Sequence, residues 1–90
     1  MNEIYATANF RLNGTDYDGK PYEATVEATL EKSGAFDYGN GTCMILKWST
    51  RERPELFDTR YAKVSARNFS EFAREQLEAM TIDTIKVEEI

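Results

Sequence analysis

Three glutamates at regular spacing are the residues of this chain best placed to act together in chemistry. Glu23, Glu27 and Glu31 stand four residues apart in a run that alternates polar and apolar side chains. On a β-strand they would share one face at intervals of about 13 Å, because alternate strand residues are about 6.6–6.8 Å apart. Neighbouring carboxylates could support acid–base catalysis, and a longer acidic row could imitate a phosphate backbone and occupy a basic nucleic-acid groove.

Other catalytic chemistry finds little support in the sequence. The chain has no histidine, which is the commonest general base and metal ligand. Its single cysteine, Cys43, allows neither an internal disulfide nor a thiolate zinc cluster, and we expect it to be a small buried hydrophobic residue. No glycine-rich phosphate-binding motif is present. The sequence therefore predicts a protein that is not an enzyme and that has no cofactor or metal.

The charge of the chain restricts its partners. The net charge is -5, from 16 acidic and 11 basic residues. Direct binding to nucleic acid or to anionic lipid needs a surplus of Lys and Arg, so neither is expected. No stretch approaches the roughly 18 apolar residues that span a bilayer, and the first residues lack the basic-then-apolar pattern of a signal peptide. We expect a cytoplasmic protein that does not contact membranes.

The three glutamates belong to an alternating segment, residues 22–32, which predicts a strand with one dry and one wet face. Residues 3–12 repeat the pattern, with the same even-numbered positions apolar. A two-residue Asp18–Gly19 turn would place Phe10 opposite Glu27, whereas a three-residue loop over 17–19 pairs Phe10 with Val26. We therefore predict the three-residue loop, with Gly19 in the left-handed conformation.

The remaining segments complete the predicted fold. We expect strands over about 42–50, 56–66 and 82–88, and one helix over about 69–80. Asn68 and Glu71 form a capping-box pattern at the start of the helix. The apolar stripe of the helix consists of Phe69, Phe72, Ala73, Leu77 and Met80. The sequence predicts a single α+β domain over residues 1–90, a two-layer sandwich in which a mostly antiparallel sheet of four to five strands carries one C-terminal helix on its dry face, in the order β-β-β-β-α-β.

The neighbours of the glutamates offer a plainer interpretation of the row. If Leu30 pairs with Met44, Lys47 falls beside Glu27 and Arg51 beside Glu23. Opposite charges directly across strands stabilise a sheet by about 0.2–1 kcal/mol. An ordinary solvated sheet face is therefore favoured over a purpose-built acidic mimic.

A second candidate site is the connection over residues 33–41, which is rich in glycine and carries Phe36 and Tyr38. Rigid aromatic side chains on such a loop can anchor a partner protein. The alternative is that both rings fold back and cap the end of the sheet.

These observations favour a small non-catalytic domain that binds another protein. Its candidate contact residues are Phe36, Tyr38, Glu23, Glu27 and Glu31. In size and charge the chain resembles small acidic proteins of phages and mobile elements, including some anti-CRISPR proteins, although no motif in it matches one of them. That resemblance implies the alternative function, an acidic nucleic-acid mimic that blocks a basic nucleic-acid-binding site. An uncovered edge strand could also pair with a second copy to form a homodimer.

Overall fold

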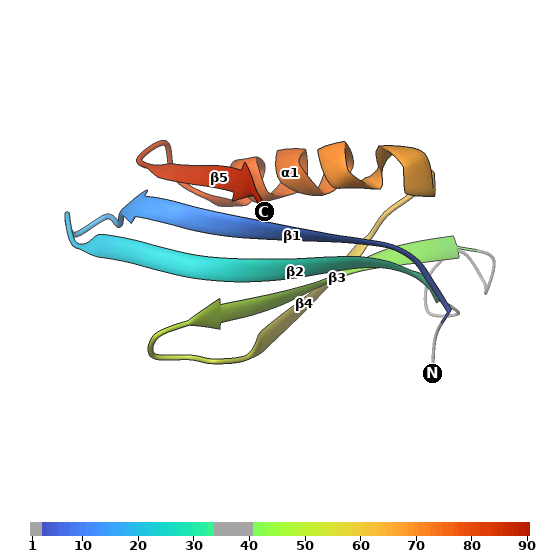
Figure 1. Cartoon of the computed structure of the whole chain (residues 1–90), viewed down its shortest axis with the longest axis horizontal. Helices are drawn as coiled ribbons and strands as arrows, with labels where there is room; N and C mark the ends of the chain where they lie inside the picture. The colour runs from blue at the N-terminus through green and yellow to red at the C-terminus, as the bar shows by residue number, and fades with distance from the viewer. Residues whose placement is uncertain (1–2, 34–40) are drawn as a thin grey trace.

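A computed structural model describes residues 3–33 and 41–90 (Figure 1). Within them, five strands form one antiparallel sheet in the order β4-β3-β2-β1-β5, and one helix packs on one face of it. The elements are β1 (Ile4–Thr15), β2 (Pro21–Ser33), β3 (Gly41–Thr50), β4 (Leu56–Tyr61), a 3-10 turn (Ala66–Asn68), α1 (Phe69–Met80) and β5 (Ile85–Glu89). The predicted α+β sandwich and its element order are confirmed.

The first hairpin has the register that the alternation of the sequence requires. Phe10 pairs with Val26, so both apolar rows lie on the same face of the sheet. Gly19 adopts a φ of 78°, as a three-residue loop demands. Asp16 closes the loop: its Oδ1 accepts the backbone N–H groups of Asp18 and Lys20, each at 2.9 Å. The predicted loop is therefore confirmed.

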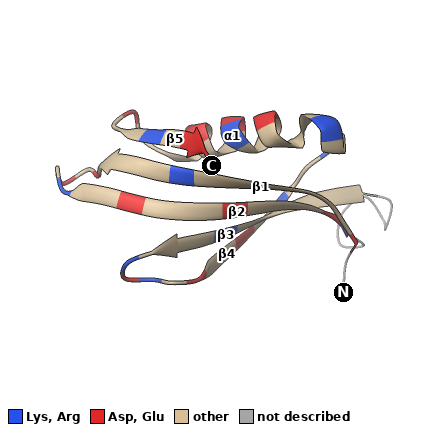
Figure 2. Ribbon diagram, in the orientation of Figure 1, with Lys and Arg blue, Asp and Glu red and all other residues tan. Residues whose placement is uncertain are grey.

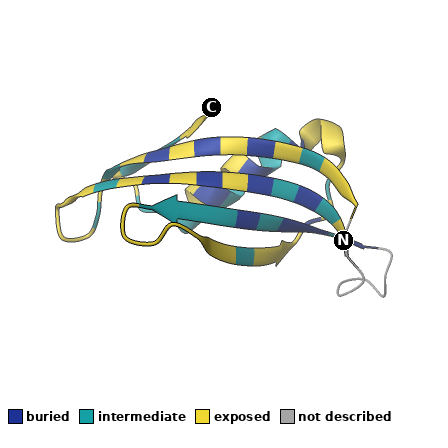
Figure 3. Ribbon diagram, turned by 60° about the horizontal axis from the view of Figure 1, so that its bottom comes forward, coloured by how far each residue is buried: buried dark blue, intermediate teal, exposed yellow. Residues whose placement is uncertain are grey.

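The core lies between the helix and one face of the sheet, which we call the inner face. This face carries the even-numbered side chains of β1 from Ala6 onward and of β2, β3 and β4, together with the odd-numbered Ile85 and Val87 of β5. Figure 3 shows the resulting alternation of buried and exposed residues along the strands. Alanines such as Ala8 and Ala28 are buried among larger side chains, and their small volume leaves room for the helix to approach the sheet. The largest fully buried side chains are Phe10, Phe69, Leu12, Leu30, Met44, Leu46, Leu77 and Val26.

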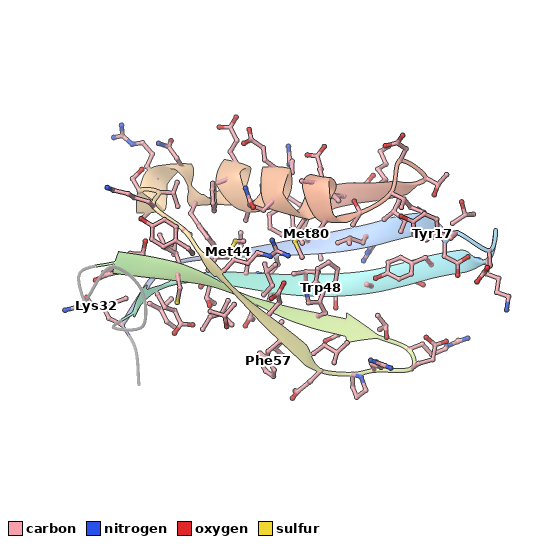
Figure 4. All side chains as sticks on the ribbon, turned by 180° about the vertical axis from the view of Figure 1, so that it is seen from behind. Tyr17, Lys32, Met44, Trp48, Phe57 and Met80 are labelled. Carbon is pink, nitrogen blue, oxygen red and sulfur yellow. The ribbon has the colours of Figure 1, made fainter. Side chains whose placement is uncertain are left out.

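The helix covers only part of the inner face, since it packs against β1 and β5. The chain between β4 and α1 covers another part of that face, as it runs from the β4 edge back to the start of the helix (Figure 4). Ala62 in this connection is buried, and Val64 packs against the core. The hydroxyl of Thr42 in β3 donates a hydrogen bond to the carbonyl oxygen of Ala62 and holds the connection in place.

Three predicted details of these elements are wrong. The strand expected to continue to about residue 66 ends at Tyr61, because the chain turns inward to bury Ala62. Asn68 makes no side-chain capping bond; it ends the 3-10 turn, and its backbone N–H donates to Ser65. The last strand begins at Ile85 rather than at 82, after a turn that this residue closes with a 3.0 Å bond from its N–H to the carbonyl of Ile82.

Gly14 lies in β1 opposite Ile85, at the start of β5, with no room for a side chain. A Cβ atom at this position would overlap the carbonyl oxygen of Thr84 and come within 2.8 Å of the Cα of Ile85. We expect Gly14→Ala to lower the free energy of unfolding by about 1–3 kcal/mol, the usual cost of overpacking. Gly19→Asn is the control, since nothing lies within 4 Å of that site and Asn tolerates positive φ. Urea denaturation measures both, and equal stabilities would contradict the prediction.

Candidate functional site

The odd-numbered side chains of β1 to β4 and the even-numbered side chains of β5 form the face of the sheet opposite the helix, which we call the outer face. In Figure 3 this face is turned forward and the helix lies behind the strands. Among the residues that the structure describes, no helix or strand lies over it. Both the predicted glutamate row and the aromatic side chains of β4 belong to this face.

The structure brings the glutamate row and cationic side chains together. Glu27 pairs across β2 and β3 with Lys47, as predicted. Lys47 Nζ lies 3.9 Å from Glu55 Oε1, so its ion pair is with the connection between β3 and β4, while Glu27 is its partner in the strand register. The paired residues of β2 and β3 end at Ala24 and Thr50, so Arg51 does not pair with Glu23 across the strands. Both residues nevertheless line the same shallow depression of about 370 Å³.

Glu31, the third member of the row, has a different environment. It is half-buried, pairs with Cys43 of β3, and its Oε2 accepts a 2.8 Å hydrogen bond from the hydroxyl of Thr29. Figure 2 shows acidic and basic residues interspersed over the sheet and the helix. The three glutamates share a face as predicted, and basic residues interrupt the acidity of that face.

The strongest apolar feature of the outer face lies on the edge strand β4. Phe57 is 63% exposed and Tyr61 is 49% exposed, opposite Lys47 and Cys43 of β3 respectively. Figure 4 shows Phe57 pointing away from the helix. Ile45, between these two positions on β3, is half-buried on the same face. We call Phe57, Tyr61 and Ile45 the β4 patch.

Cys43 is buried, as expected, but on the outer face beside the β4 patch rather than in the main core. Its cross-strand neighbours are Glu31 on one side and Tyr61 on the other. The buried thiol therefore belongs to the apolar part of the outer face, at the end of the sheet where the patch lies.

An apolar notch of about 240 Å³ lies on the inner face at the C-terminal end of the helix. Trp48 and Met80 line it together with Tyr22, whose phenol has its pKa raised by burial. Because the folded-state pKa is raised, this tyrosine favours the folded state below its unfolded pKa of about 10, and that contribution is lost as the pH rises further. Trp48 packs against the core, as expected from its size.

The structure leaves two of the predicted contact residues untested. Phe36 and Tyr38 lie outside the described residues. Within the described part of the chain, no group of three or more acidic, histidine or cysteine side chains could hold a metal ion. The exposure of Phe57 and Tyr61 was missed by sequence reasoning, because the predicted strand over about 56–66 carries no sign that it forms the edge of the sheet.

Comparisons with known proteins add no relative. No family model, curated protein or solved structure matches the chain. Across residues 3–33 and 41–90, no helix is long and apolar enough to cross a membrane.

Proposed function

We propose that this protein is a non-catalytic, cytoplasmic interaction domain that binds another protein through the β4 patch. The observation that carries the proposal is the 63% exposure of Phe57 on a sheet face that no described helix or strand covers. Burying an aromatic side chain at an interface releases the free energy of removing its apolar surface from water. Exposed aromatic residues on a rigid sheet are therefore well suited to anchor a partner.

The surroundings of the β4 patch support the same proposal. Lys47 stands opposite Phe57, and Glu27 lies one strand beyond Lys47, so the two provide a charged border on one side of the apolar patch. An apolar patch with a charged border is typical of protein–protein interfaces, in which a few buried aromatic residues contribute most of the binding free energy. The strands fix the backbone of the patch, so little conformational entropy is lost when a partner binds.

The alternative, a nucleic-acid mimic built on Glu23, Glu27 and Glu31, has weaker support. A mimic needs an uninterrupted negative surface, and Lys47 lies directly opposite the central glutamate. This alternative predicts a binding affinity that falls steeply with salt and is lost on Glu27→Lys. The proposed aromatic interface predicts a shallow dependence on salt.

The proposal is tested by replacing the central aromatic residue with serine. Immobilised wild-type protein and Phe57→Ser are compared for capture from host lysate, with quantification by mass spectrometry. We expect the captured partner to fall at least about tenfold for Phe57→Ser, as for an interface hot spot.

Tyr17→Ser is the matched control, because Tyr17 is the more exposed aromatic residue, at 89%, and lies on the distant hairpin loop. It should capture the partner as the wild type does. Equal capture by all three proteins, each shown to be folded by its thermal unfolding curve, would reject the β4 patch as the interface.

A further inference from the structure

The two edges of the sheet differ in how they are protected from pairing with another strand. The edge strand β5 exposes charged residues, Lys86, Glu88 and Glu89, which discourage edge-to-edge association. The edge strand β4 exposes the apolar side chains of Leu56 and Phe57, next to the charge pair that Asp58 and Arg60 form within the strand. An exposed apolar edge strand is a ready template for a further strand.

The backbone of β4 is oriented for such pairing. The N–H of Ala62, just after the strand, donates to the carbonyl of Thr42 in β3 at 3.3 Å. Hydrogen-bonding directions alternate along an antiparallel strand, so even-numbered residues of β4 face β3 in the same way. The N–H and C=O groups of Phe57 and Thr59 therefore point toward the edge of the sheet.

The side chains of β4 are self-complementary in one register. We propose that β4 pairs antiparallel with β4 of a second copy of this chain, about a two-fold axis at Thr59. In this register Asp58 of each copy faces Arg60 of the other, so the two-fold axis relates two identical pairs of opposite charges. Thr59 faces its own symmetry mate, and Phe57 faces Tyr61 of the second copy.

Charge selects this register over its neighbours. Centring the pair on Asp58 would place the two aspartates opposite each other, and centring it on Arg60 would do the same with the two arginines. Shifts by one residue would place the helices on opposite faces and break the two-fold symmetry that closes a dimer.

The paired strands would make one continuous ten-stranded sheet with both helices on the same face. The two β4 patches would then meet across the axis and form a single aromatic surface on the outer face. The charges that select the dimer register can be tested apart from the proposed partner site, because Asp58 and Arg60 lie on the inner-face side of β4 while Phe57 lies on the outer face.

Charge reversal tests the dimer in solution. Light scattering after size-exclusion chromatography should give the wild type twice the chain mass of 10.3 kDa. Asp58→Arg and Arg60→Asp should each give the monomer mass, since each makes both cross-axis contacts repulsive. An equimolar mixture of the two variants, and the double variant D58R/R60D, should recover the dimer mass.

A wild-type monomer at the highest soluble concentration, or single variants that remain dimeric, would overturn the proposal. Each single variant also breaks the 3.1 Å ion pair between Arg60 Nε and Asp58 Oδ2 within one chain, so its folding is checked by thermal unfolding. The double variant keeps an opposite charge pair at these two positions.

A backbone variant tests the same contact without changing charge. Thr59→Pro removes an N–H that points to the edge, where proline is tolerated in a strand. It should be monomeric, while Thr59→Ala, which keeps the N–H, should remain dimeric; dimers in both would contradict the pairing.

Capture by a monomeric but folded Thr59→Pro variant would show that the partner interface survives without the dimer. Loss of capture by a Phe57→Ser variant that is still dimeric would show that the dimer forms without the partner interface.

Discussion

Phe10→Ala is expected to lower the free energy of unfolding by about 3–5 kcal/mol, the usual cost of truncating a buried phenylalanine. Phe10 is fully buried in the middle of β1, opposite Val26 and beneath the helix layer. A domain of this size is typically stable by about 5–15 kcal/mol in total, so the variant should be close to unfolding at room temperature. Urea denaturation followed by tryptophan fluorescence measures the loss, since the single Trp48 packs against the same core.

Asn9→Ala is the matched control for this prediction. Asn9 is the preceding residue of β1, and its exposed side chain lies on the outer face. A substitution there should change the free energy of unfolding by no more than about 0.5 kcal/mol. Equal losses at both positions would mean that the two faces of β1 have been assigned incorrectly.

Leu77→Asp is expected to prevent folding. Leu77 is fully buried where the helix meets the sheet, and the core cluster around it is composed of apolar side chains. An aspartate there would bury a carboxylate without a partner, at a cost of several kcal/mol that exceeds what most domains of this size can absorb. Circular dichroism and size-exclusion chromatography should show an unfolded or aggregated chain.

Phe72→Asp is the informative comparison on the same helix. The apolar stripe of the sequence includes Phe72 as well as Leu77, and by that pattern alone either substitution should unfold the domain. In the structure Phe72 is only half-buried at the border of the core. A carboxylate at that position can reach water, so we expect a folded variant of reduced melting temperature. Equal damage by the two substitutions would show that the helix docks with a different face.

The central fold could be predicted because the alternation in β1 and β2 allows one register from Ala6 onward. Only the start of β1 departs from it, since the register shifts between Ile4 and Ala6 and leaves Ile4 exposed opposite Glu31. A one-residue slip would turn Phe10 toward water, so the loop length and the conformation of Gly19 followed from the pattern. The helix start was predicted correctly although the expected cap at Asn68 is absent. The preceding 3-10 turn uses the backbone of that residue, and a short local motif could not reveal this.

The candidate site was less predictable because it depends on the order of strands in space. The pairing of Glu27 with Lys47 follows from matching apolar rows across β2 and β3, and it is confirmed. The exposure of Phe57 follows from the position of β4 at the edge of the sheet. Strand order is set by contacts between distant segments, and a period-two pattern carries no information about it.

The position of β1 has a consequence for how the chain acquires its shape during synthesis. β1 lies between β2, which follows it directly, and β5, whose neighbouring Thr84 hydroxyl donates to the carbonyl of Thr15, 69 residues earlier. A ribosome therefore releases the first hairpin long before the segment that borders its other side exists. Contacts between such distant segments form slowly, since the intervening chain must first be ordered. Until β5 docks, the N–H and C=O groups on that side of β1 stay unpaired in the nascent hairpin. They can then pair with strands of other nascent chains.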